Sequence, residues 1–193
     1  GRDTRVYLAN TLLKLRKFDE LYVLADELIA GPRIRADEAQ IYYVVANASF
    51  EREDYARASE YYRLFEQNRG SLNRADFFRY GYAHYQLQEY QEAVPIFQKA
   101  LGRRYDSLSQ VSSYYLGFCF LKEGDEANAR VAFQKAAEGE RLGNPEIAKD
   151  ALYQYGKLSF STENYSDALD AFTDLIERYP AADFIPEVQG LVG

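Results

Sequence analysis

The sequence has no methionine or tryptophan, and only one cysteine and one histidine in 193 residues. Because Cys119 is the single cysteine, an intramolecular disulfide is excluded, and we expect this thiol to be inert packing. His84 has no catalytic or metal-ligating residues at a convergent spacing. We therefore interpret His84 as a core or half-core residue and predict neither a catalytic centre nor a metal site around it.

Long apolar runs are also missing. No segment approaches the roughly 18 apolar residues that crossing a lipid bilayer requires, so we expect no direct membrane insertion. Positive charge is in deficit, since the formal net charge is −7. That field repels a phosphate backbone and an acidic membrane surface, which makes nucleic acid an improbable partner.

Enzyme signatures are missing as well. There is no glycine-rich phosphate loop before a helix, no His-Glu-x-x-His motif and no isolated nucleophile motif. The acidic pairs Glu53-Asp54 and Asp125-Glu126 lie at expected turns, where helix capping explains them better than acid–base chemistry. We predict that the chain is not an enzyme and holds no cofactor.

The composition that remains is that of a folded protein rich in aromatic residues. Hydrophobic residues make up 47% and charged residues 27% of the chain. Aromatic residues reach 16%, as 18 Tyr and 12 Phe. Tyrosine suits half-buried positions, because its ring packs while its hydroxyl stays hydrated. This composition indicates a large ratio of surface to core.

Four segments of the chain align without gaps around a small residue. The anchors Ala46, Gly81, Gly117 and Gly156 are 35, 36 and 39 residues apart. A tyrosine or glutamate, an alanine and an aromatic residue follow each anchor at fixed distances, for example Tyr165, Ala168 and Phe172 after Gly156. A weaker copy with Phe18, Leu21 and Ala25 precedes them. The sequence is therefore an array of about five repeats of about 36 residues.

The repeat resembles the tetratricopeptide repeat, on the evidence of Leu116, Gly117, Phe120, Ala129 and Phe133 in one copy and the closing Pro180 in another. The resemblance implies an all-α fold, a right-handed superhelical array (α-solenoid) of antiparallel helix hairpins, over 1–193. The expected repeats cover approximately 2–34, 39–71, 74–106, 110–142 and 149–181, with a terminal helix over 183–193 in which Val192-Gly193 is the next Leu-Gly pair. The absence of an initiator methionine and the unpaired last helix favour a fragment of a longer protein.

Within each repeat, small residues are expected where the two helices cross. Gly81, Gly117 and Gly156 fall in helix interiors, where glycine costs up to about 1 kcal/mol relative to alanine unless a close approach compensates. We predict that Ala93, Ala129 and Ala168 fill the other side of each crossing. The turns between paired helices carry Asp54, Asp125 and Asn164, which suit capping.

A second stripe runs along each first helix at i, i+4 and i+7. In the family this stripe lines the concave groove that binds peptides, so the resemblance implies a protein or peptide partner there. The candidate groove residues are Tyr43, Asn47, Phe50, Phe78, Tyr82, Tyr85, Tyr114, Phe118, Tyr153 and Lys157. The aromatic ones form an apolar patch of a kind that usually binds something, although packing between neighbouring helices is an equal explanation for single residues.

The stripe also bears on two other functions. The carboxylate clamp of some relatives needs a lysine where Val6 or Tyr43 stands, so we reject it although Asn10 and Asn47 match its asparagine. The alternative to a binding scaffold is a structural spacer or self-assembly segment, which leaves a homo-oligomer possible.

The location of the protein is indicated only by one segment. Arg178-Tyr179-Pro180, with Phe184 and Glu187, is similar to the segment between repeats of bacterial envelope proteins. The resemblance implies a periplasmic or outer-membrane-associated protein, with the cytoplasm as the alternative.

Overall fold

The computed structural model describes residues 4–32, 34–140 and 143–192, and every element within these ranges is helical. The all-α prediction is confirmed. In chain order the α-helices are α1 (Thr4–Lys14), α2 (Phe18–Ala30), α3 (Ala39–Glu51), α4 (Tyr55–Gln67), α5 (Arg74–Gln86), α6 (Tyr90–Ala100), α7 (Ser107–Lys122), α8 (Glu126–Ala137), α9 (Pro145–Ser161), α10 (Tyr165–Arg178) and α11 (Ile185–Val192). A short 3-10 helix, η1 (Glu138–Glu140), extends α8.

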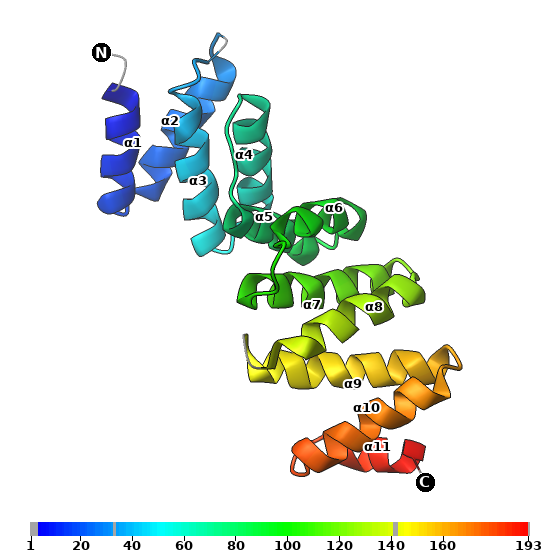
Figure 1. Cartoon of the computed structure of the whole chain (residues 1–193). Helices are drawn as coiled ribbons and strands as arrows, with labels where there is room; N and C mark the ends of the chain where they lie inside the picture. Colours follow the sequence, from blue (N-terminus) through cyan, green and yellow to red (C-terminus); the bar gives the residue numbers. More distant parts are fainter. Residues whose placement is uncertain (1–3, 33, 141–142, 193) are drawn as a thin grey trace. The chain divides into compact units, whose positions relative to one another are not determined.

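The chain divides into two compact units, Gly1–Glu89 and Tyr90–Gly193. In the first unit α1 packs on α2 and α3, and α3 packs on α4 as its hairpin partner (Figure 1). In the second unit each helix from α6 to α11 packs on the next, and α7 also contacts α9. A single array over 1–193 stays a prediction.

Two first helices begin before the start of the repeat range in which we expect them. α7 begins at Ser107 and α9 at Pro145, before the expected repeat starts at 110 and 149. In both cases a polar residue just ahead caps the helix: Asp106 accepts from the Ser109 amide, and Asn144 accepts from the Glu146 amide. The caps therefore place the first turn earlier than the apolar pattern does.

All five turns between paired helices use the same backbone device. Each contains one residue with positive φ, namely Arg16, Glu53, Gln88, Gly124 or Glu163. The residue after it donates its amide hydrogen back to a carbonyl of the last helical turn, as Asp125 does to Phe120 at 2.8 Å. This Schellman closure satisfies carbonyls that the helix end leaves unpaired.

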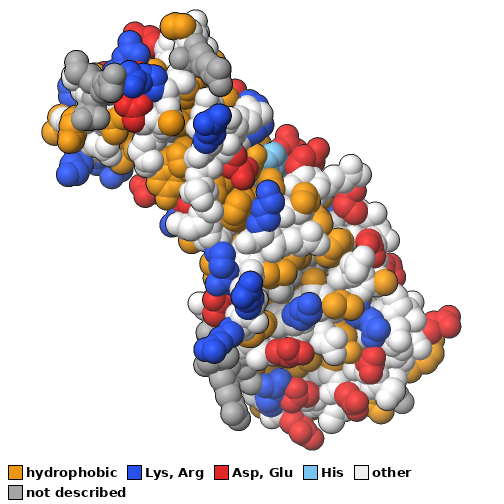
Figure 2. Space-filling view, turned by 45° about the horizontal axis from the view of Figure 1, so that its top comes forward, with side chains coloured by type: hydrophobic (Ala, Val, Ile, Leu, Met, Phe, Trp, Pro, Cys, Tyr) orange, Lys and Arg blue, Asp and Glu red, His pale blue; other side chains and the backbone are white. Residues whose placement is uncertain are grey.

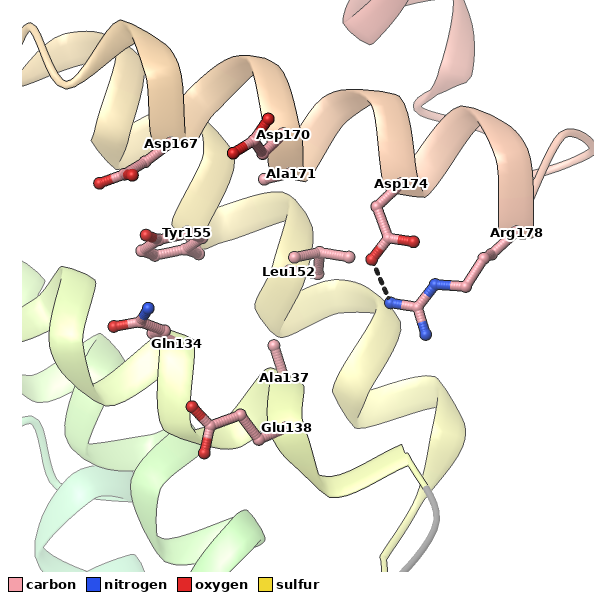
Figure 3. A pocket seen from close by; sticks show the side chains of 10 residues that line it. All are labelled: Gln134, Ala137, Glu138, Leu152, Tyr155, Asp167, Asp170, Ala171, Asp174 and Arg178. Carbon is pink, nitrogen blue, oxygen red and sulfur yellow. Dashed lines mark hydrogen bonds and ion pairs between the residues drawn. The ribbon is translucent and has the colours of Figure 1, made fainter.

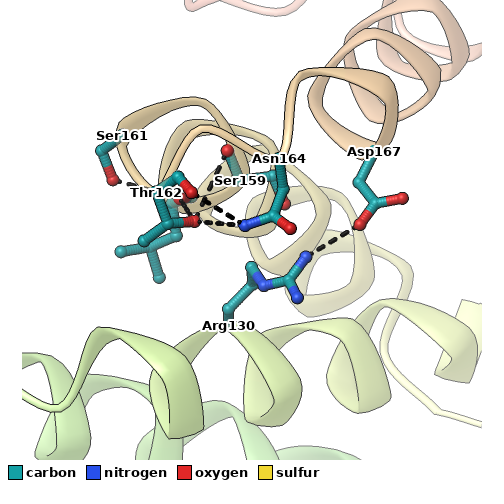
Figure 4. Close-up of polar contacts among 7 residues, drawn as sticks. Arg130, Ser159, Ser161, Thr162, Asn164 and Asp167 are labelled. Carbon is teal, nitrogen blue, oxygen red and sulfur yellow. Dashed lines mark hydrogen bonds and ion pairs between the residues drawn. The ribbon is translucent and has the colours of Figure 1, made fainter.

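The side-chain caps predicted at these turns are confirmed for two of three residues. Asp54 accepts from the Arg57 amide and Asp125 from the Asn128 amide. The prediction for Asn164 is wrong, because its side chain instead donates to the Thr162 hydroxyl at 2.9 Å and to the Thr162 carbonyl at 3.0 Å (Figure 4). That bond ties the turn to the end of α9.

Two of the glycines predicted at helix crossings, Gly117 and Gly156, face aromatic rings. A Cβ added to Gly117 would lie 2.7 Å from the Phe133 ring, and one added to Gly156 would lie 2.6 Å from the Phe172 ring. The predicted fillers Ala129 and Ala168 are buried, but the nearest side chain to each glycine is the phenylalanine four residues later. The phenylalanine ring therefore occupies the space that each glycine leaves, and the place of Ala129 and Ala168 at the crossing stays a prediction.

The core of the second unit is built from these contacts. Ala129, Phe133 and Ala136 of α8 pack with Ala151 and Leu158 of α9. Phe172 and Leu175 of α10 pack with Val188 of α11 in a second cluster. The terminal helix is thus joined to the core, while the predicted Gly193 lies outside the described residues.

None of the helices in the described ranges combines the length and apolarity that a bilayer span requires.

Candidate functional site

Three tyrosines of the predicted groove are engaged with the next first helix. Tyr43 of α3 donates its hydroxyl hydrogen to Asp76 of α5 at 3.0 Å. In the second unit Tyr114 of α7 donates to Asp150 of α9 at 2.6 Å, and Tyr153 of α9 to Glu187 of α11 at 2.5 Å. The same position in three repeats therefore links consecutive first helices, a structural role that the spacing alone did not reveal.

The acceptor Asp76 is almost fully buried, with 1% of its surface exposed. It accepts hydrogen bonds from the Asn73 amide at 3.0 Å and from Arg79 at 3.2 Å as well as from Tyr43. Its charge is therefore compensated by three donors, which a buried carboxylate requires. Burial, followed by the nearby Glu187, raises the pKa of Tyr153 to about 12, so this tyrosine stays a hydrogen-bond donor at neutral pH.

The first unit gathers several predicted aromatic residues into one group, which Tyr55 of α4 joins. Ring centroids lie 5.9 Å apart between Phe50 and Tyr82, 5.8 Å between Tyr55 and Tyr82, and 6.0 Å between Phe78 and Tyr82. Tyr85 lies 6.2 Å from Tyr82. We call Phe50, Tyr55, Phe78, Tyr82 and Tyr85 the aromatic cluster. All five are half-buried, so the structure brings these predicted residues together on a partly accessible face.

Asn47, another predicted groove residue, is engaged within its own hairpin. Its side-chain oxygen accepts a hydrogen bond from Tyr62 at 2.7 Å. Tyr62 is fully buried. Asn47 therefore satisfies a core hydroxyl and forms part of the hairpin's own packing.

In the second unit the predicted residues form two smaller contacts. Phe118 meets Tyr114 and the core residue Phe133 edge to face, each at 4.9 Å between centroids. The Lys157 ammonium lies 4.5 Å from the centroid of the Tyr153 ring, and this ring also stacks on Phe184 at 4.5 Å. This cation–π arrangement leaves a positive charge at the edge of an aromatic surface.

A separate pocket of about 780 Å³ lies between the second helices α8 and α10, with α9 at its floor. Figure 3 shows Gln134, Ala137 and Glu138 on one side and Asp167, Asp170, Ala171, Asp174 and Arg178 on the other, over Leu152 and Tyr155. The volume falls within the range of about 300–1,000 Å³ typical of ligand-binding pockets.

Four acidic residues and one arginine give the pocket lining a net negative charge. Asp174 pairs with Arg178 at 2.5 Å, and Asp167 pairs with Arg130 of α8 at 2.8 Å (Figures 3 and 4). Sequence reasoning considered acidic residues only at turns and missed this pocket. The spacing of Asp167, Asp170 and Asp174 was the available signal, because i, i+3 and i+7 share one face of a helix.

His84 and Cys119, the two side chains most often found in reactive sites, are engaged in packing and local contacts. The His84 imidazole lies 2.6 Å from Glu89 and its ring is 5.1 Å from that of Tyr80. Cys119 is fully buried, and this burial raises the pKa of its thiol to about 12. Among the described residues, no group of three or more His, Cys, Asp or Glu is placed to hold a metal ion.

On the face of the molecule in view in Figure 2, acidic and basic side chains are interspersed with apolar ones. This mixed surface is consistent with the interspersed charges in the sequence.

The comparisons with known proteins agree on the fold. Residues 112–138 and 150–182 match a family profile described as a tetratricopeptide repeat, and residues 77–106 match a second profile with the same description. No curated protein matches the sequence.

Solved structures of similar fold cover nearly the whole chain. YrrB, described as a TPR protein with an unusual peptide-binding site, aligns with a TM-score of 0.70 and 21% identity over 96% of this chain and 90% of its own. MamA (41 to the end) from Desulfovibrio magneticus RS-1 aligns with a TM-score of 0.62 and 17% identity over 94% and 97%. PilF of Pseudomonas aeruginosa aligns with a TM-score of 0.50 and 19% identity over 98% and 97%. At these identities the likeness shows the fold.

Proposed function

We propose that this chain, which is built from tetratricopeptide repeats, is a protein-interaction scaffold that binds an apolar peptide or partner helix on its aromatic cluster. Repeats of this kind generally serve as non-catalytic scaffolds. The fold itself does not choose a partner, so the proposal depends on the side chains that the first helices present.

The aromatic cluster is the observation that carries the proposal. Its five rings hold one another at centroid distances near 6 Å while staying half-buried. Rings held in this way lose little conformational freedom on binding, which favours affinity. YrrB, a protein of similar fold, is described as having an unusual peptide-binding site, which supports peptide binding by a chain of this fold.

The remaining predicted groove residues have different proposed roles. Tyr43, Asn47, Tyr114 and Tyr153 are engaged with neighbouring helices, so we propose that they set the spacing of the surface. Lys157, beside Tyr153, is the proposed contact for a carbonyl or carboxylate of the bound segment.

A selection from a random-peptide phage library tests this function. We expect the full chain to enrich peptides that carry aromatic or large aliphatic residues. The double variant Tyr82→Ser, Tyr85→Ser should not enrich them. The control Leu15→Ser, Val23→Ser removes two apolar side chains that are 62% and 58% exposed outside the cluster, and it should enrich the same peptides. Failure of the wild-type chain to enrich any sequence family would contradict the proposal.

The alternative function, self-assembly, is favoured by a second apolar surface. Tyr165 and Leu169 of α10 are 57% and 51% exposed, and Phe160 at the end of α9 is 42% exposed. With Leu191 and Val192 of α11 they line a small pocket of about 220 Å³. This surface could bind an amphipathic helix of a second copy.

The repeat pattern supports that interpretation of Leu169. Tyr22 and Arg130 occupy the equivalent position in earlier repeats. The Arg57 guanidinium of the next second helix lies 3.9 Å from the Tyr22 ring centroid, and Asp167 of the next second helix binds Arg130. In these two repeats the position therefore contacts the following second helix.

Sedimentation velocity over a range of concentrations tests self-assembly. If the surface joins two copies, Leu169→Lys should shift a concentration-dependent dimer toward monomer. Wild-type chain that sediments as a monomer throughout would exclude this second function.

We also propose an envelope location, periplasmic or outer-membrane-associated. The support is the segment from Arg178 to Glu187, which is similar to inter-repeat segments of envelope proteins. Fractionation of the source cells, followed by detection of the protein with an antibody, tests the proposal. Recovery only in the cytoplasmic fraction would establish the alternative location.

A further inference from the structure

The pocket between α8 and α10 has chemistry different from that of the aromatic cluster. We propose that it binds a basic amphipathic helix of a partner protein, with lysine or arginine on one side and aliphatic residues beneath. This interaction goes beyond the proposed peptide binding, because its residues come from the second helices and from α9, and none belongs to the aromatic cluster.

The charge balance of the pocket selects a cationic partner. Four carboxylates line it, from Glu138, Asp167, Asp170 and Asp174. Asp167 and Asp174 are each paired with an arginine. Within the described ranges, the side-chain carboxylates of Glu138 and Asp170 take part in no hydrogen bond or ion pair, and both residues are exposed. Two negative charges on opposite sides of the pocket are therefore left for an incoming cation.

The floor of the pocket selects an amphipathic segment over a simple cation. Leu152 and Tyr155 of α9 lie between Ala137 of α8 and Ala171 of α10 (Figure 3). Small alanines on both walls leave room above the leucine. Aliphatic side chains and the methylene stems of lysine or arginine can cover this floor while their charged ends reach the carboxylates.

The spacing of the carboxylates matches a helical ligand. Asp167, Asp170 and Asp174 follow one line along α10. At the rise of an α-helix that line is about 10 Å long. A partner helix that lies in the groove along α10 can place one basic residue opposite Asp170 and another toward Glu138 on the facing wall, while Asp167 and Asp174 keep their arginine partners.

Fluorescence anisotropy with a defined probe tests the proposal. The probe is a labelled helix-forming peptide of leucine and lysine, with its lysines on one face, and the protein is the full chain. We expect saturable binding that weakens as salt rises. The double variant Glu138→Gln, Asp170→Asn should bind about tenfold more weakly, since each lost exposed ion pair contributes up to about 1 kcal/mol.

A charge-matched variant distinguishes binding in the pocket from general attraction of the basic probe to an acidic protein. Asp19→Asn, Glu51→Gln changes the net charge by the same amount on exposed residues of the first unit, and it should bind the probe as the wild type does. Equal weakening by both double variants would mean non-specific attraction to an acidic protein and would overturn the proposal. The proposal would also be overturned if the wild-type protein bound a version of the peptide in which glutamate replaces every lysine.

The outcome is independent of the aromatic cluster. Tyr82→Ser, Tyr85→Ser leaves every pocket residue in place and should bind the basic probe normally. Loss of basic-probe binding in the pocket variant alone supports this inference even where the aromatic cluster fails its own test. Unchanged binding in the pocket variant overturns the inference and leaves the aromatic cluster unaffected.

Discussion

Tyr43 donates its hydroxyl hydrogen to Asp76, which lies 33 residues later in the chain, at 3.0 Å. The bond joins the first helices of consecutive repeats, and its acceptor is a carboxylate with 1% of its surface exposed. A side chain chosen from the sequence as a peptide contact is therefore also a joint between repeats.

Removal of this hydroxyl should destabilise the first unit. Tyr43→Phe keeps the ring, which lies 5.1 Å from that of Phe65, but takes one donor from a buried carboxylate. We expect a loss of about 1–2 kcal/mol in the free energy of unfolding, measured by urea titration. Tyr55→Phe is the control, because no described residue forms a hydrogen bond with that hydroxyl. Equal stability of the Tyr43 variant and the control would contradict the structural role.

The buried tyrosines predict a loss of stability at alkaline pH. Burial, followed by the nearby Glu66, raises the pKa of Tyr80 from 10.0 to about 12. Between these values the unfolded chain releases the phenolic proton and the folded chain keeps it. Since the unfolded state then binds fewer protons, stability should be full below pH 10 and fall as the pH rises toward 12.

Tyr80→Phe isolates this contribution. It removes the titrating group and keeps the buried ring, so the fall in unfolding free energy across this pH range should become shallower by up to about 1.4 kcal/mol per pH unit. Chemical denaturation at several pH values from 8 to 12 measures the slope. An identical slope in wild type and variant would refute the assignment.

The contact between Gly117 and Phe133 predicts opposite effects of the same substitution at two glycines. Gly117→Ala places a Cβ 2.7 Å from the ring, whereas a Cβ on Gly190 of α11 has nothing within 4 Å. We expect Gly117→Ala to destabilise by about 1–3 kcal/mol through overpacking. Gly190→Ala should stabilise by up to about 1 kcal/mol through helix propensity.

Thermal denaturation measures both variants. A Gly117→Ala protein that melts at or above the wild-type temperature would mean that the Phe133 ring moves aside without cost. The glycine would then not be required by the packing of α7 on α8.

The sequence predicts the helices well because the same pattern of small and aromatic residues recurs in several repeats. The pattern of Gly117, Ala129 and Phe133 recurs in Gly156, Ala168 and Phe172, and both copies form the same packed hairpin. The starts of α7 and α9 could not be placed from apolar spacing, because Asp106 and Asn144 begin these helices with polar capping bonds.

The sequence predicts the candidate site less completely than it predicts the helices. Helical spacing placed Tyr82 and Phe50 on one surface, but the partners of Tyr114 and Tyr153 lie 36 and 34 residues away in the next first helix. Periodicity assigns a residue to a face of its own helix and does not reveal which neighbouring side chain covers it. Apolar spacing does not predict the acidic pocket for the same reason, since Glu138 and Asp170 come from different helices on opposite sides of it.

The most direct test of the central claim is calorimetric titration with a peptide selected on the wild-type chain. Three proteins are compared: the wild type, the double variant Tyr82→Ser/Tyr85→Ser and the control double variant Leu15→Ser/Val23→Ser. Each gives one dissociation constant, and circular dichroism checks that each variant is folded. The proposed function predicts binding at least about tenfold weaker for the tyrosine variant, because two aromatic contacts of the site are lost, and unchanged binding for the control. Equal affinity in all three proteins would contradict the claim that the aromatic cluster is the peptide site.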